Sequence, residues 1–341
     1  MALIPLSDTD SLIRESERSA SRYVRACEAG ILAGDDPRFA AATALAGGAD
    51  RLVITSSGPG FDAASFGATA FSESGFDAVA IHAGDLVSAT GRFRPHDVLI
   101  GIDSESASVA GALRRARRSG VHTIGLTTRG LTILDADVLV QVAALDDAGH
   151  DAGPATLVYS LALGLMAARL EPDTPLASEI KTFPRMLAGI SARCADLGSA
   201  LTATRSSHGR LVLAGRGDSL WAVNGLARGL NMTLANEGGF AALATHLNDI
   251  EDGLWSFSAH DMLIEIDPQE PVRQHRADDR SHAATRPLRH WSFSAQPSKL
   301  PGSVKLPVSS PALASLLAFS ALSRVFAEFT HAGRQSSRHD V

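Results

Sequence analysis

Short apolar runs alternate with amphipathic segments along the first half of the chain. Each run has the length of a β-strand, and most are too apolar for a strand with one face in water. The segments between them show helical periodicity, as in VAGALRRARRSG at 109–120. This alternation predicts a parallel sheet with helices on both faces, joined by right-handed crossovers. The five predicted strands are RLVITSS (51–57), DAVAIHA (77–83), DVLIGID (97–103), VHTIGLT (121–127) and VLVQVA (138–143).

The second half of the chain repeats the first. RLVITSSGPG at Arg51 recurs as RLVLAGRGDS at Arg210, and HDVLIGID at His96 recurs as HDMLIEID at His260. The two offsets, 159 (210 − 51) and 164 (260 − 96), are nearly equal, so we predict two copies of one domain. The strands of the second copy are RLVLAG (210–215), FAALA (240–244), DMLIEID (261–267), RHWSFS (289–294) and SVKLPV (303–308), before a long helix from about residue 310.

Two apolar stretches, from Pro154 and from Pro311, have the length of membrane spans. Each opens with Pro at a first helical position and carries polar or charged residues, so we predict core helices and no membrane. Together, the repeat and the predicted helices divide the chain into five segments. They are a helical N-terminal part (1–47), a first domain (48–172), a linker with a connecting helix (173–208), a second domain (209–333) and a mobile tail (334–341).

Composition limits the possible partners and the compartment. The 341 residues carry a net charge of −6 and only 5% aromatic residues, which argues against nucleic acid as a partner. Cys27 and Cys194 are too few for a disulfide framework and fit a reducing compartment. The N-terminus turns acidic before the apolar core of a signal peptide develops, so we expect a cytoplasmic protein.

Two serine-containing turns are candidate phosphate sites. SSGPG and DSESAS follow the first and third predicted strands, and open parallel sheets bind ligands beyond the carboxyl ends of their strands. A helix that starts there offers free N–H groups and its positive dipole end to an anion, although a serine can equally be only a helix cap. The second copy has PQEP in place of the serines, so this fold does not need them to start the helix, which favours an anion site in the first copy. The candidate binding residues are Ser57, Gly58, Gly60, Ser104, Glu105, Ser106 and Ser108, of which Glu105 is unexpected because a carboxylate repels a phosphate.

An arginine cluster follows in the same predicted helix. Arg114, Arg115, Arg117 and Arg118 lie toward its C-terminal end, where cations complement the helix dipole. Such a cluster is usually a solvated face, and a binding role is the less favoured alternative.

Acid–base chemistry is concentrated in the segment 231–255. Glu237, His246 and Glu251 are the candidate proton-transfer residues, with solvated loop carboxylates as the alternative interpretation. No metal-ligand spacing such as HExxH occurs, so we expect neither a metal nor another cofactor.

With its duplicated domain and the SESAS turn, the chain resembles the SIS (sugar isomerase) family, over most of residues 45–330. It looks most like the isomerase half of glucosamine-6-phosphate synthase and the related sugar-phosphate isomerases and deaminases. The resemblance implies two tandem flavodoxin-like domains in an α/β fold, one phosphate site in the first domain, and a homodimer. It also implies a phosphorylated sugar or aminosugar as ligand.

The family's catalytic residues are not all present. Asn231 aligns with the catalytic glutamate, Glu251 to Gly253 with the turn that carries the ring-opening histidine, and the C-terminal lysine has no counterpart. One hypothesis is therefore a sugar-phosphate isomerase or deaminase that transfers a proton between C1 and C2 with replacement residues. The alternatives are a non-catalytic sugar-phosphate-binding protein, or the same fold with other chemistry on another ligand.

Overall fold

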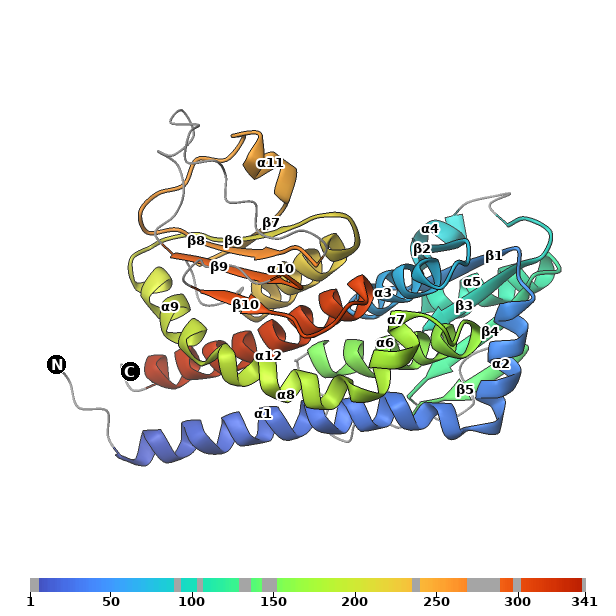
Figure 1. Ribbon diagram of the computed structural model, residues 1–341, viewed down its shortest axis with the longest axis horizontal. Helices are drawn as coiled ribbons and strands as arrows, with labels where there is room; N and C mark the ends of the chain where they lie inside the picture. Colours follow the sequence, from blue (N-terminus) through green and yellow to red (C-terminus); the bar gives the residue numbers. More distant parts are fainter. Residues whose placement is uncertain are drawn as a thin grey trace. The chain divides into compact units, whose positions relative to one another are not determined.

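The computed structural model describes residues 6–88, 93–102, 107–128, 136–142, 152–234, 240–268, 289–296 and 302–338. The chain divides into two compact units. The first-sheet unit comprises Arg25–Pro184 and Val308–Leu316, and the second-sheet unit comprises Met1–Val24, Arg185–Pro307 and Leu317–Val341. Each unit contains one five-stranded parallel sheet (Figure 1).

The first sheet has the strand order β2-β1-β3-β4-β5, which is the flavodoxin-like order. Ile54 and Val53 of β1 are fully or almost fully buried, as expected for a strand covered on both faces. The five predicted strands are confirmed within one or two residues at each end. They are β1 (Arg51–Ser56), β2 (Ala78–His82), β3 (Asp97–Ile102), β4 (His122–Thr127) and β5 (Val138–Gln141).

Helices cover both faces of the first sheet. Val53 packs in a core with α4 (Ala83–Ser88) and α5 (Ala107–Arg118). Ile54 points to the opposite face, toward α3 (Gly60–Glu73) and α6 (Ala152–Leu170). There α3 approaches so closely that a Cβ at Gly67 would lie 2.6 Å from Cδ1 of Leu163 on α6, so a larger residue would force Leu163 to shift.

The second sheet has the equivalent order β7-β6-β8-β9-β10, which confirms the duplication (Figure 1). One face carries a small core of Val212, Ala214 and Leu263, covered by α11 (Leu247–Glu251) and the loop after it. On α10 (Leu220–Leu234), Trp221 packs against Phe319 of α12 (Pro311–Arg338) with ring centroids 5.4 Å apart. The strands are β6 (Leu211–Gly215), β7 (Ala242–His246), β8 (Met262–Ile266), β9 (Arg289–Ser294) and β10 (Ser303–Lys305).

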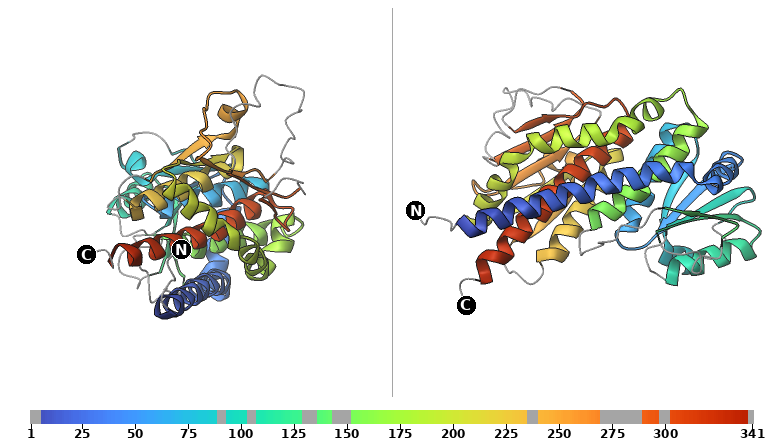
Figure 2. Two further views of the ribbon diagram at one scale, coloured as in Figure 1. Left: turned by 90° about the vertical axis from the view of Figure 1, so that its left-hand side faces the viewer. Right: turned by 90° about the horizontal axis from the view of Figure 1, so that it is seen from below.

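The remaining helices include two long ones, α1 and α12, each continuous along its length (blue and red in Figure 2). The apolar stretches from Pro154 and Pro311 form α6 and α12. By length and composition both could cross a membrane, but 83% and 72% of these windows are buried within the structure, as in core helices. The other helices are α1 (Leu6–Leu32), η1 (Ala33–Asp35), α2 (Pro37–Gly47), α7 (Pro175–Glu179), η2 (Ile180–Thr182), α8 (Phe183–Arg193), α9 (Ala195–Ser206), η3 (Gly217–Ser219), α10 (Leu220–Leu234), α11 (Leu247–Glu251) and α12 (Pro311–Arg338).

An arginine–aspartate pair explains the most similar parts of the repeat. In the first sheet Arg51 donates to Asp97, whose carboxylate is fully buried, with Nη2 2.5 Å from Oδ2. In the second sheet Arg210 donates to Asp261 in the same way, at 2.6 Å. Each pair joins the amino ends of the two central strands, so RLV and HDxLI recur because they form the same bridge.

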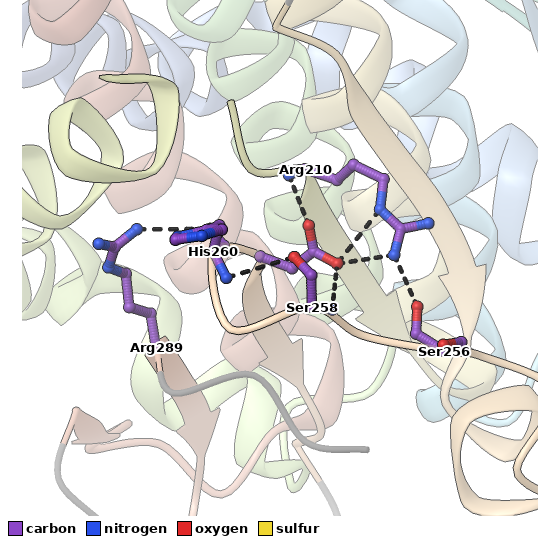
Figure 3. Close-up of polar contacts among 6 residues, drawn as sticks. Arg210, Ser256, Ser258, His260 and Arg289 are labelled. Carbon is purple, nitrogen blue, oxygen red and sulfur yellow. Dashed lines mark hydrogen bonds and ion pairs between the residues drawn. The ribbon is translucent and has the colours of Figure 1, made fainter. Parts of the chain in front are cut away.

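Asp261 organises the loop before β8. Its carboxylate also accepts hydrogen bonds from the backbone N–H groups of Arg210 and Ser258, both at 2.8 Å. Arg210 Nη2 continues to the carbonyl of Ser256 (2.6 Å; Figure 3). Burial alone would raise the pKa of Asp261, but these hydrogen bonds outweigh burial and hold it well below its usual range.

Candidate functional site

The carboxyl ends of β1 and β3 lie at the point where the strand order of the first sheet reverses. Ligands of open α/β sheets bind at such a switch point. The buried hydroxyl of Ser56 donates to the carbonyl of Ile102 (2.9 Å) and so joins these two strand ends. This bond fixes the backbone from which the turn at Ser57 departs.

The turn between β1 and α3 is held by hydrogen bonds to the carbonyls of Gly58 and Pro59. Gly58 has φ +55°, a conformation that favours glycine, and no atom of the described residues lies within 4 Å of where its Cβ would be. The hydroxyl of the buried Thr156 on α6 donates to the carbonyl of Pro59 (3.2 Å). The amides of Phe61 and Asp62 bond back to the carbonyls of Gly58 and Pro59. The turn is therefore rigid, and the described residues leave space above Gly58.

One helix begins after β1 and another after β3, on either side of the switch point. Gly60 opens α3, a helix of 14 residues, and Ser108 is the second residue of α5, a helix of 12 residues. Both direct the positive ends of their dipoles to the switch point, which favours an anion. The buried carboxylate of Asp62, in the first turn of α3, has the opposite effect, because its negative charge disfavours an anion there. Of the predicted phosphate-binding residues, Ser57, Gly58, Gly60 and Ser108 lie at this edge, whereas Ser104, Glu105 and Ser106 lie outside the described residues.

The switch point of the second sheet has a different character. Arg216 follows β6, and its Nη2 lies 2.5 Å from Oε1 of Glu251, at the end of α11. Its Nε lies 4.0 Å from Oδ2 of Asp267, which follows β8. All three side chains are partly accessible, from 11% to 24% exposed. The result is a guanidinium between two carboxylates, a site suited to hydroxyl groups and proton transfer and poorly suited to a phosphate.

The GRGD turn that carries Arg216 is held by Ser219. The hydroxyl of this fully buried serine donates to the carbonyl of Ile266 (2.6 Å) and accepts from the N–H of Arg216 (2.9 Å). Ser219 therefore joins the ends of β6 and β8 just as Ser56 joins those of β1 and β3.

The residue aligned with the family's catalytic glutamate and the other two proton-transfer candidates either form structural contacts or lie outside the described residues. The amide of Asn231 forms two hydrogen bonds of 2.8 Å with the backbone of Ala242, one donated and one accepted, and so holds α10 to the start of β7. His246 Nδ1 accepts from the N–H of Asn248 (3.2 Å) and caps α11. Glu237 lies outside the described residues. Glu251 is the candidate that the structure brings together with other charged groups.

Sequence reasoning missed three residues at these edges. Arg216 and Asp267 were not recognised as partners of Glu251, although both stand at the ends of repeated strand motifs. His82, the last residue of β2, packs edge-on against Phe61 of α3 with ring centroids 5.5 Å apart. It is paired with Ser56 in the β1–β2 register and thus adds an imidazole to the edge that carries the serine turn. Across the described part of the chain, no cluster of three or more His, Cys, Asp or Glu side chains is arranged to hold a metal ion.

Three solved structures that are similar to this chain are named as proteins of sugar-phosphate metabolism. The chain is similar to the C-terminal domain of glucosamine-fructose-6-phosphate aminotransferase from Francisella tularensis, with a TM-score of 0.73 and 14% identity over 93% of this chain and 95% of that one. It is similar to tagatose-6-phosphate ketose/aldose isomerase from Escherichia coli, with a TM-score of 0.71 and 16% identity over 94% and 93%. A third match is glucosamine-6-phosphate deaminase from Thermotoga maritima, with a TM-score of 0.63 and 10% identity over 92% and 94%.

These likenesses extend over almost the whole length of each chain and confirm a two-domain SIS-type fold. No protein-family model and no curated protein sequence matches this chain. At 10–16% identity the structural matches establish the fold alone, and the activity must be argued from the site.

Proposed function

We propose that this protein binds a phosphorylated sugar or aminosugar at the carboxyl edge of its first sheet and acts on it as an aldose/ketose isomerase or a deaminase. The observation that supports it most directly is the rigid, open turn at Gly58, set at the switch point with the starts of α3 and α5. The names of the structural neighbours agree with such a ligand. By the same resemblance we propose a cytoplasmic homodimer.

The phosphate would be held without arginine. Ser57 and Ser108 would donate hydroxyl hydrogen bonds, the backbone at Gly58 and Gly60 would lie against the oxygens, and the serines of the 104–106 segment would complete the set. Uncharged donors and helix dipoles suffice for a phosphate in such turns.

Proton transfer would fall to Glu251. Its carboxylate would take the proton from C2 of the open-chain aldose and return it to C1, while the proton of the O2 hydroxyl passes to the carbonyl oxygen O1, so that an enediol forms and then becomes the ketose. General acid–base catalysis of this kind typically contributes ~10²–10⁴-fold to the rate. Arg216 would hold the carboxylate in place, since a bidentate-capable guanidinium fixes a carboxylate more firmly than an ammonium does.

The test combines binding and turnover on the full chain. Hexose and hexosamine 6-phosphates are incubated in D₂O, and NMR follows deuterium incorporation at C1 and C2 while ammonia release is measured separately. Glu251→Gln should lower turnover ~10²-fold or more with little change in sugar-phosphate affinity. Glu328→Gln is the matched control, because Glu328 also pairs with an arginine, Arg324 (3.0 Å), on α12. Turnover by Glu251→Gln at the rate of Glu328→Gln would overturn the role of Glu251.

The phosphate subsite is tested by Ser57→Ala with Ser108→Ala. Loss of two hydrogen bonds to a charged group should weaken sugar-phosphate binding by about tenfold or more. Ser65→Ala, a hydroxyl on α3 that bonds to the carbonyl of Phe61, is the control. If no sugar phosphate binds the wild-type chain, the ligand class is wrong.

A non-catalytic sugar-phosphate-binding protein is the second candidate. The roles of Asn231 and His246 in holding β7 and α11 favour it, because two positions considered for catalysis are engaged in backbone contacts. Sugar-phosphate binding without deuterium incorporation or ammonia release would establish this alternative and exclude the enzyme.

A further inference from the structure

Two adjoining hollows open at the amino edge of the first sheet, opposite the edge of the proposed sugar-phosphate site. Their volumes are about 440 and 660 Å³, within the range of small-molecule pockets. Gly120, Val121 and His122, which connect α5 to β4, line both hollows. The two hollows therefore meet at this connection.

Arginines dominate the lining of both hollows. Arg114, Arg117 and Arg118 line the smaller one, and Arg94 and Arg115 line the larger one. Four of these five residues are exposed, and Arg115 is half-buried. A chain with a net charge of −6 thus concentrates positive charge at one small concave surface.

The two carboxylates among the described lining residues are already paired. Asp97 is bound by Arg51, which lies outside the hollows, and accepts the backbone N–H of Arg94 (2.7 Å). Asp137 lies 3.0 Å from Nε of Arg117 and accepts the N–H of Thr123 (2.8 Å). These pairs leave the lining with an excess of positive charge, supplied mainly by Arg94, Arg114 and Arg118.

The backbone beside Arg94 differs from its counterpart in the second copy. In both copies the residue three positions before the paired aspartate donates its N–H to that carboxylate, Arg94 to Asp97 and Ser258 to Asp261. His96, however, has φ +64°, an uncommon conformation for a residue other than glycine, and His260 does not share it. The duplicated bridge does not need this conformation, so it is specific to the turn that borders the basic hollow.

We propose that this surface binds a small anion with two or more linked phosphate groups, such as a diphosphate or triphosphate moiety. A guanidinium binds phosphate oxygens through two parallel hydrogen bonds, so arginines suit this ligand better than other cations. The arginines are distributed over two hollows that meet at Gly120, and a ligand with linked phosphates reaches both. A single phosphate would reach only one. The site is separate from the proposed sugar-phosphate site and stands independently of the proposed activity.

Titration calorimetry on the full chain tests the proposal, with inorganic tripolyphosphate and inorganic phosphate as probes. Tripolyphosphate should bind with at least tenfold higher affinity than phosphate. The double variant Arg114→Ala with Arg118→Ala should weaken tripolyphosphate binding about tenfold to a hundredfold, the effect of losing charge-assisted hydrogen bonds. Lysine at both positions should restore part of the affinity, because charge is kept and the paired geometry is lost.

Arg185→Ala is the matched control, an exposed arginine on α8 that lines neither hollow. Arg94→Ala is a second test from a different segment, and its backbone N–H to Asp97 is retained. Equal binding by wild type and the double variant would overturn the proposal, as would an equal loss in Arg185→Ala. Equal affinity for phosphate and tripolyphosphate, or loss of tripolyphosphate binding in the Ser57→Ala, Ser108→Ala variant, would also overturn it.

Discussion

Replacing Asp261 with asparagine tests whether the repeated arginine–aspartate bridge stabilises the fold. The carboxylate of Asp261 is 2% exposed and accepts from the Arg210 guanidinium, the Arg210 amide and the Ser258 amide. Asparagine has nearly the same shape, so the substitution removes the charge and one acceptor oxygen without leaving a cavity.

The expected cost follows from these contacts. Breaking a buried ion pair by removing one partner typically costs ~3–5 kcal/mol. The guanidinium of Arg210 is 48% exposed and can turn to water, which reduces the cost, while the two backbone amides still need acceptors. We therefore expect Asp261→Asn to lower the free energy of unfolding by about 2–4 kcal/mol at pH 7.

The effect should depend on pH with a defined sign. Because the pKa of Asp261 is lower in the folded than in the unfolded chain, its contribution is present above about pH 4 and is lost as the pH falls below that value. The difference between wild type and Asp261→Asn should therefore shrink by up to about 1.4 kcal/mol per pH unit below pH 4.

Urea unfolding at pH 7, 5, 4 and 3.5 measures both quantities. Asp252→Asn, an exposed carboxylate after α11, is the control and should stay within about 0.5 kcal/mol of wild type. A cost for Asp261→Asn as small as this control, or one that is the same at every pH, would refute the bridge as a stabilising element.

Three further predictions concern buried or bonded polar groups. Ser56→Ala and Ser219→Ala each leave a buried strand-end carbonyl without its hydroxyl donor, so urea unfolding should show a loss of about 1–3 kcal/mol for each, and a loss in only one would disprove their equivalence. Asn231→Asp loses the donor to a backbone carbonyl and should cost about 1–2 kcal/mol by the same assay, with no gain in isomer exchange; a gain would show that this position is catalytic. Burial raises the pKa of Cys27 and of Cys194 to about 12, so both thiols should resist a thiol-specific reagent at pH 8 in the native chain and react after unfolding. The same shift should lower stability as the pH rises above about 9, where unfolded thiols ionise and the folded ones do not.

The hydrophobic pattern was sufficient to predict the strands of the first sheet, because parallel strands that are buried on both faces are continuously apolar. RLV at Arg51 and at Arg210 could therefore be recognised as equivalent strands, and the sheet order followed from the resemblance. The pattern did not reveal that the repeated Arg and Asp bond to each other, because this contact joins residues 46 and 51 positions apart.

The site was predicted less completely, for a physical reason. A carboxylate such as Glu251, at the end of a short helix, has the same local sequence signal whether it is solvated or paired. Its partners Arg216 and Asp267 come from the ends of two other strands and meet it only when the sheet has formed. The roles of Asn231 and His246 were similarly hidden, since helix and strand capping depends on where the neighbouring backbone lies.

The two copies share two stabilising contacts between their central strands, but they differ in the groups that lie at the carboxyl edge of the sheet. Both have the arginine–aspartate bridge at the amino edge and a buried serine hydroxyl joining the central strands at the carboxyl edge. At the carboxyl edge, the first copy has an open glycine turn and two helix starts, whereas the second has Arg216 between two carboxylates. Because those carboxylates more than offset the charge of Arg216, the second copy disfavours a phosphate and suits hydroxyl groups. The carboxyl edges of the two sheets therefore offer different contacts: a glycine turn and two helix starts in the first copy, and a guanidinium paired with carboxylates in the second.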